Sequence, residues 1–271
     1  MKKYFYIISL VCFTLHVMGQ ENGVTIVPIN TFHSHPVPTD SLIIHKFAWD
    51  TTSWTLFVKD GQILALNIDH PNAREYVPAD TLPLQVIEQL WNDEKIDYKK
   101  GNGILPVDDG YLIGIDQGEW GGRILWYSKD GKEKYKISDD QISDFIRKDG
   151  HIYAIEGLLH TYTSKGSFIE LRKINSKWVS QLVTKLPFAP FGIAINSKNN
   201  FVIGTSNNII EMRKDGHYTI LCDKPVWNAF DDNYLDPKSL LIKNDILYAG
   251  MKKGVLRYDL RTKEERWLMR D

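Results

Sequence analysis

Residues 103–115 read Gly-Ile-Leu-Pro-Val-Asp-Asp-Gly-Tyr-Leu-Ile-Gly-Ile, and this stretch decides the fold. Two apolar runs, each of strand length, stand on either side of Asp109-Gly110. Aspartate and glycine readily adopt the positive backbone φ angles that short hairpin turns require. The stretch therefore predicts a β-hairpin whose two strands are almost continuously apolar. Such strands are typically covered on both faces.

The same hairpin recurs four more times along the chain. Its turns fall at Asp60-Gly61, Asp109-Gly110, Asp149-Gly150, Asn199-Asn200 and Asn244-Asp245. The turns are therefore separated by 49, 40, 50 and 45 residues, which is the period of one propeller blade. In most units a second hairpin follows, and its strands alternate apolar and polar residues as half-exposed strands do. These second hairpins are expected at 124–137, 169–183, 209–221 and 255–268.

The spacing of the paired hairpins, over about residues 42–270, resembles that of β-propeller repeats of the broad WD40/YVTN-like superfamily. The resemblance implies an all-β fold of about five four-stranded blades, with six as the alternative. It rests on hairpin spacing, because no unit carries a Trp-Asp closing pair, a kelch double glycine or a quinoprotein tryptophan-docking motif at regular spacing. The competing architecture is a large sandwich or an open barrel.

Two segments depart from the repeat. The N-terminal segment, residues 24–29 with 42–47, can complete a blade together with the C-terminus or build a sixth blade. Either arrangement closes the ring and removes exposed strand edges. In residues 83–93, apolar side chains recur at a spacing of three to four. This pattern predicts a short amphipathic helix inserted between the first and second units.

The first twenty residues have the pattern of a secretory signal peptide. The basic pair Lys2-Lys3 precedes an apolar run from Tyr4 to Val17, and small or modest side chains precede a cut before Gln20. The run is shorter than the roughly 20 residues that a spanning helix needs, which argues against a membrane anchor. We therefore assign residues 1–20 to a signal peptide and 21–271 to a single domain. We expect an exported protein, periplasmic or extracellular, without membrane insertion after cleavage.

Several classes of function lack support in the sequence. The net charge of −1 gives no reason to expect a nucleic-acid partner. No phosphate loop, nucleotide fingerprint, Gly-x-Ser-x-Gly elbow or His-Glu-x-x-His helix occurs, and we expect neither a cofactor nor a metal. Cys222 would be the one cysteine left after signal cleavage. Its place at the end of a strand pattern favours a buried apolar role over that of a nucleophile.

Loops that join the second and third strands of each unit are expected to open on one face of a propeller, where ligand sites in this architecture usually lie. The most distinctive of them, Asp116–Gly122, surrounds Glu119 and Trp120 with three glycines. Glycine lets a ligand approach the backbone closely. There Asp116 and Glu119 can accept hydrogen bonds from hydroxyl groups while Trp120 stacks on a sugar. The alternative is a tight loop in which Trp120 plugs a gap between blades.

Two further loops of the same face contribute candidates. In the third unit, His160 with Glu156 could perform acid–base chemistry, or it could be a surface histidine. In the loop 223–237, Trp227 offers a second stacking surface and Asp231 an acceptor. The Asp-Asp-Asn run of this loop also supplies oxygen ligands suited to Ca²⁺, but it lacks the glycine and the terminal glutamate of an EF-hand.

The leading hypothesis is an exported, non-catalytic binding protein whose ligand is a carbohydrate or another envelope or secreted protein. Its candidate ligand-binding residues are Asp116, Glu119, Trp120, Glu156, His160, Trp227 and Asp231. The rival is a propeller hydrolase or lyase acting on a glycan or lactone, with Glu119 as proton donor and Asp116 or Asp231 as base or nucleophile. A third alternative is an immunity-type or structural module that binds a protein through a flat face.

Overall fold

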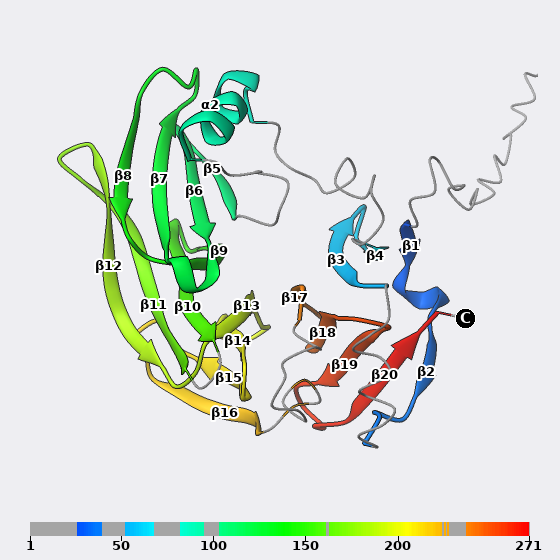
Figure 1. Cartoon of the computed structure of the whole chain (residues 1–271). Helices are drawn as coiled ribbons and strands as arrows, with labels where there is room; N and C mark the ends of the chain where they lie inside the picture. The colour runs from blue at the N-terminus through cyan, green and yellow to red at the C-terminus, as the bar shows by residue number, and fades with distance from the viewer. Residues whose placement is uncertain are drawn as a thin grey trace, which may run out of the picture.

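The computed structural model describes residues 26–39, 52–67, 82–94, 103–160, 163–223, 225, 227 and 237–270. These residues form five antiparallel sheets that stand around a ring (Figure 1). The chain is therefore an all-β propeller of five blades, as the hairpin spacing predicted. The expected signal peptide and the segment 42–47 lie outside the described residues. Within the described ranges, no helix combines the length and the apolar character needed to cross a membrane.

Each blade is one sheet. Blade 1 contains β1 (Ile26–Pro28), β4 (Gln62–Asn67) and β3 (Trp54–Lys59). Blade 2 contains β5 (Ile104–Val107), β6 (Gly110–Asp116), β7 (Gly122–Ser128) and β8 (Lys134–Ser138). Blade 3 contains β9 (Ile142–Lys148), β10 (His151–His160), β11 (Thr163–Ile174) and β12 (Lys177–Leu186). Blade 4 contains β13 (Pro190–Ile195), β14 (Phe201–Thr205), β15 (Asn208–Met212) and β16 (Tyr218–Asp223). Blade 5 contains β17 (Ser239–Lys243), β18 (Ile246–Gly250), β19 (Val255–Asp259), β20 (Glu265–Met269) and β2 (His33–His35).

The inner hairpins turn where the sequence predicted, for two different reasons. Asp60 and Asp149 have φ angles of 50° and 51°, and the glycines that follow them have angles of 72° and 78°. Gly110 serves another purpose. A Cβ atom there would lie 1.8 Å from the carbonyl oxygen of Tyr127 on the neighbouring strand. At this turn, glycine is needed so that two backbones can approach closely.

Neighbouring blades pack face to face to form the core. On β10, Ile152 and Ala154 face blade 2, whereas Tyr153 and Ile155 face blade 4. All four residues are at most 6% exposed. Because both faces of the strand are covered, its sequence is apolar throughout rather than alternating. Equivalent apolar clusters join blade 4 to blade 5 and blade 5 to blade 1.

An aromatic cluster lies at the centre of the core between blades 3 and 4. The Phe168 ring stacks on that of Tyr153 with centroids 5.1 Å apart, and it lies 4.9 Å from the ring of Phe201. The rings of Tyr153 and Phe201 meet edge to face at 5.0 Å. All three residues are at most 1% exposed. These offset and edge-on arrangements add to the stabilisation that comes from burying the rings.

One carboxyl group is enclosed at the same interface. Asp144, on β9, accepts a hydrogen bond from the backbone N–H of Phe145 at 2.8 Å and another from the backbone of Ile193 in blade 4. Burial between the blades raises the pKa of Asp144 to about 6, although both hydrogen bonds act to lower the pKa. Ionisation of the Asp144 carboxyl group therefore lowers the stability of the folded state.

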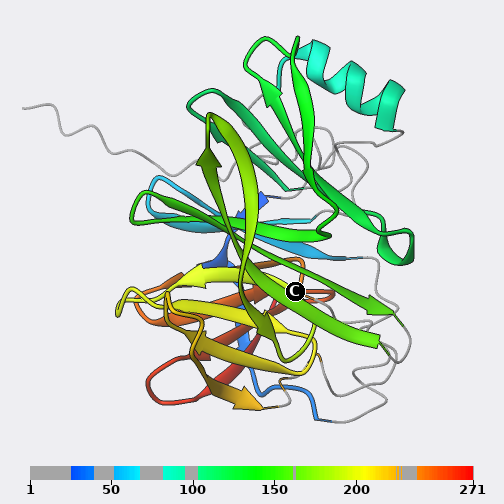
Figure 2. The same cartoon turned by 90° about the vertical axis from the view of Figure 1, so that its left-hand side faces the viewer.

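Helix α2 (Leu84–Glu94) lies where the apolar periodicity predicted a helix. Val86 and Leu90 are fully buried against blade 2, where they pack with Ile113 and Tyr127. Figure 2 shows the helix beside the strands of that blade. These strand residues lie on the face turned away from blade 3. Within the described residues, the helix therefore covers a face of blade 2 that no other blade covers.

The N-terminal segment joins the first blade to the last. Ile26 of β1 pairs with Leu66 of β4 in blade 1. After the short 3₁₀ turn Ile29–Thr31, Ser34 of β2 pairs with Leu268 of β20 and becomes part of the outermost strand of blade 5. The predicted segment 24–29 therefore contributes a strand to blade 1 and not to a blade with the C-terminus, and the strand that pairs with β20 is 33–35, which the sequence did not predict. The described residues contain no sixth sheet.

Candidate functional site

The loop between β6 and β7 is a tight turn built by its glycines. Residues Gly118–Trp120 form one turn of 3₁₀ helix, and Asp116 Oδ1 accepts the Gly118 N–H at 2.8 Å. Gly118 and Gly121 have φ angles of 63° and 88°, with open space where a Cβ atom would stand. Glycine is therefore required at both positions by backbone conformation. The turn fixes the direction in which the two residues between them project.

Trp120 projects into solvent. Its exposed fraction is 81%, which exceeds that of every other large apolar residue in the described part of the chain. The alternative that Trp120 plugs a gap between blades is therefore wrong for this structure. Burying an indole contributes a large apolar area and a polar N–H at its edge. The face of the Trp120 indole is therefore accessible to a ligand.

Glu119, which precedes Trp120, connects blade 2 to blade 3. Glu119 Oε2 lies 3.2 Å from His160 Nε2 at the end of β10, and both side chains are about half exposed. An exposed contact of this kind contributes little to stability. Its effect is to hold the loop of blade 2 against the end of blade 3. The second oxygen of Glu119 keeps its capacity to accept a hydrogen bond.

Gln141, which was not predicted from the sequence, holds the base of this loop. Its Nε2 donates to Asp116 Oδ1 at 2.5 Å and to the Gly118 carbonyl oxygen at 2.7 Å. Its backbone carbonyl oxygen accepts the Gly157 N–H at 3.0 Å, and the residue is 8% exposed. A single glutamine in the connection between two blades forms no sequence pattern. Its role is visible only when the structure places it beside Asp116 and Gly118.

Glu156 is the carboxyl group of this face with an altered pKa. Burial is the main cause and raises its pKa, while a hydrogen bond from the Ser167 side chain and one from the Gln141 backbone act in the opposite direction. The structure thus brings together five of the seven predicted residues, Asp116, Glu119, Trp120, Glu156 and His160, at the adjoining ends of blades 2 and 3.

The other two predicted residues do not join this group. Trp227 is 2% exposed, and its Nε1 donates to the Thr205 carbonyl oxygen at 2.8 Å. It packs in the core between blades 4 and 5. The prediction that Trp227 is a stacking surface is therefore wrong, because an apolar core takes up the ring and a backbone acceptor satisfies its N–H. Asp231 lies outside the described residues.

Metal and thiol chemistry find no support in the described residues. No three His, Cys, Asp or Glu side chains in these ranges are placed to hold a metal ion. Cys222 Sγ lies 3.3 Å from Glu265 Oε1. Burial, followed by the Glu265 carboxylate, raises the pKa of the Cys222 thiol to about 12. The thiolate that a nucleophile requires is therefore scarce at neutral pH.

Solved structures that resemble the chain share little sequence with it. No protein-family model and no curated relative match the chain. Among solved structures, a GH43 endo-arabinanase from Bacillus licheniformis is 11% identical, with a TM-score of 0.39, over 61% of this chain and 76% of that one. The Pan2 WD40 domain of Neurospora crassa is 13% identical, with a TM-score of 0.40, over 61% and 48%. An auxiliary nutrient binding protein from Bacteroides ovatus is 8% identical, with a TM-score of 0.41, over 61% and 40%.

Proposed function

We propose that this chain is an exported, non-catalytic binding propeller whose surface at the ends of β6 and β10 takes a carbohydrate. The observation that carries the proposal is the exposure of Trp120, 81%, on a turn whose backbone is fixed by glycines. An indole face and an adjacent carboxylate match the two sides of a sugar. The apolar face of the sugar ring stacks, and its hydroxyl groups donate.

The polar neighbours of Trp120 support a pre-formed surface. Glu119 is held by His160 at 3.2 Å, and Asp116 is held by Gln141 at 2.5 Å. Because these groups are already in place, a ligand does not bear the cost of ordering them. The five clustered residues span two blades, so the ligand would contact both.

Trp120→Ala should abolish carbohydrate binding without loss of stability. The measurement is the thermal melt of the chain from Gln20 against a panel of neutral and acidic glycans. A ligand at a hundred times its dissociation constant adds about 2.7 kcal/mol, which for a domain of this size raises Tm by roughly 5–10 °C. Substituting this exposed residue should leave the melt without glycan within about 0.5 kcal/mol of wild type.

Val58→Ala is the matched control, since Val58 is 56% exposed and lies in blade 1. The control should keep the full glycan shift. If no glycan raises the Tm of the wild-type chain, the carbohydrate proposal is wrong. Proteins are then the next ligands to test. If Trp120→Ala retains the shift, a glycan binds elsewhere on the molecule.

The raised pKa of Glu156 favours a glycan-acting enzyme as the second candidate. A proton donor must be protonated near neutral pH, and burial biases Glu156 in that direction. If the face is catalytic, Glu156 suits the donor role better than Glu119, which is half exposed and paired with His160. Release of product from a glycan that binds, lost in Glu156→Gln while binding persists, would establish this alternative.

Export is part of the proposal and has its own test. The basic pair Lys2-Lys3 and the apolar run to Val17 predict cleavage before Gln20. Expression of the full chain in a bacterial host with a periplasm should yield a product in the periplasm or medium that begins at Gln20, as read by N-terminal sequencing. An intact N-terminus in the cytoplasm would contradict export and leave the binding face untouched.

A further inference from the structure

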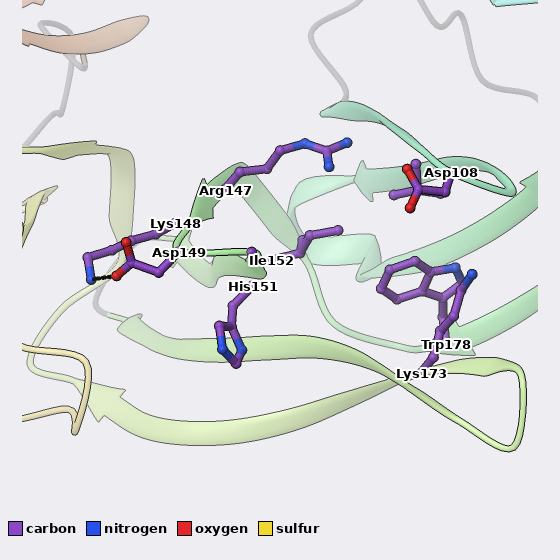
Figure 3. A pocket seen from close by; sticks show the side chains of 10 residues that line it. Asp108, Arg147, Lys148, Asp149, His151, Ile152, Lys173 and Trp178 are labelled. Atoms are coloured by element: carbon purple, nitrogen blue, oxygen red, sulfur yellow. Dashed lines mark hydrogen bonds and ion pairs between the residues drawn. The ribbon is translucent and has the colours of Figure 1, made fainter.

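A cavity opens on the opposite face of the ring from Trp120, between blades 2 and 3, with a volume of about 320 Å³ (Figure 3). Its wall comes from the β5–β6 turn, the β9–β10 turn and the β11–β12 hairpin. Strand β10 runs from His151 at this cavity to His160 at the other face. The cavity is therefore separate from the carbohydrate surface proposed above.

Two of the cations at the cavity are already neutralised. Lys148, whose side chain is 6% exposed, pairs with Asp149 at 2.8 Å. Lys173 pairs with Asp109 at 2.8 Å, and its Nζ lies 5.0 Å from the centre of the Trp178 ring. Since each lysine has its own carboxylate, neither pair calls for a charged ligand.

His151 is likewise satisfied by the protein. Its Nδ1 lies 2.7 Å from Glu170 Oε1, and its Nε2 lies 3.2 Å from Lys214 Nζ. Both ring nitrogens therefore lie within hydrogen-bond distance of protein groups, and the imidazole serves as a flat wall.

Arg147 and Asp108 are the charged side chains of the cavity that form no ion pair within the described residues. Arg147 uses one of its five N–H donors on the Pro106 carbonyl oxygen. In the described part of the chain, no carboxylate pairs with Arg147 and no cation pairs with Asp108. Figure 3 shows the two side chains extending into the same edge of the cavity, Asp108 from the β5–β6 turn and Arg147 from β9. One positive and one negative group are thus presented together.

The remainder of the wall is apolar. Val107 and Ile152 are 7% and 6% exposed, and both line the cavity. Figure 3 places the six-membered ring of Trp178 on the side nearest Ile152. A ligand that reached both charges would therefore also have an apolar surface beside it on which to bury a hydrocarbon group.

We propose that this cavity binds a free α-amino acid with an apolar side chain. The carboxylate would accept paired hydrogen bonds from the Arg147 guanidinium, whose planar fork matches carboxylate geometry. The ammonium group would donate to Asp108, and the side chain would pack on Ile152 and Trp178. A simple anion would place its charge beside Asp108, and a neutral sugar would leave the Arg147 charge unmatched. A zwitterion complements both charges at once.

The test is calorimetric titration of the wild-type chain with three ligands that share one side chain. L-phenylalanine carries both charges, 3-phenylpropanoate lacks the ammonium group, and phenethylamine lacks the carboxylate. L-phenylalanine should bind at least about tenfold more tightly than either analogue, because hydrogen bonds between charged groups are worth more than one factor of ten each.

Two variants assign the two charges. Arg147→Gln should weaken L-phenylalanine to the affinity of phenethylamine and leave phenethylamine itself unchanged. Asp108→Asn should weaken L-phenylalanine to the affinity of 3-phenylpropanoate. Both residues are exposed, so each variant should melt as the wild type does. Trp120→Ala, at the other face, should leave all three titrations unchanged.

Three results would overturn the proposal. They are the absence of L-phenylalanine and L-leucine binding at millimolar concentration, equal affinity for L-phenylalanine and 3-phenylpropanoate, and full binding by Arg147→Gln. Equal affinity for the acid and the amino acid would mean that the cavity is a simple anion site. Because Trp120→Ala tests the other face, none of these results bears on carbohydrate binding.

Discussion

Phe168→Ala should lower the free energy of unfolding by about 3–5 kcal/mol, as truncation of a buried phenylalanine does. Phe168 has no exposed surface and contacts the rings of Tyr153 and Phe201 across the interface of blades 3 and 4. The alanine would leave a cavity and remove ring contacts from both blades. Since small proteins are stable by only about 5–15 kcal/mol, much of the folded margin would be lost.

Denaturant titration measures this effect, and two variants bracket it. Phe168→Leu retains most of the volume and should cost less than Phe168→Ala, while the exposed Val58→Ala should lie within about 0.5 kcal/mol of wild type. A loss below about 1 kcal/mol for Phe168→Ala would mean that the two blades do not share a tightly packed core.

Asp144→Asn should stabilise the protein at pH 8 by about 1–3 kcal/mol, which follows from a pKa difference of about two units. The reference pKa of aspartate is 3.8, and in the fold the pKa is about 6. Between these pH values the folded state binds more protons than the unfolded state. Stability therefore falls as the pH rises from about 4 to about 6 and stays lower above it. Asparagine has nearly the same shape without a charge, and its Oδ1 can accept the Phe145 N–H.

Thermal melts between pH 4 and pH 8 measure both parts of this prediction. At pH 8 the variant should melt roughly 2–10 °C above wild type, and its stability should change less with pH across the same window. Asp139→Asn is the control, because Asp139 is 78% exposed and pairs with Lys136 on the surface. It should keep the pH dependence of wild type. A variant less stable than wild type at pH 8 would show that the Asp144 charge is favourable in the fold.

The fold could be predicted because its units repeat. Five inner hairpins with Asp-Gly or Asn-rich turns gave the blade count, and an apolar period of three to four gave helix α2. The helix was placed in the right part of the chain, but its role was not foreseen. Apolar periodicity indicates that one face is buried, and it does not say which surface covers that face. The structure assigns it to blade 2.

The candidate site was predicted in part, since residues that lie in equivalent loops meet when blades stand side by side. This brought Glu119 and His160 to 3.2 Å. Trp227 was assigned to the binding surface wrongly, because the sequence pattern of a tryptophan in a long loop does not show whether its ring is buried or exposed. Gln141, Arg147 and Asp108 were missed because single polar residues at strand ends have no periodicity. The roles of these residues depend on side chains and backbone groups that neighbouring blades bring close to them.

The pairing of β2 with β20 also orders events in time. Ser34 is synthesised long before Leu268, with which it pairs. Until β20 has been synthesised, β2 has no partner strand in blade 5, so this pairing cannot form earlier. Contacts so distant in sequence form slowly, because a long loop must close first. A chain that has not yet reached β20 would therefore leave the edge of β2 that pairs with β20 open to other strands.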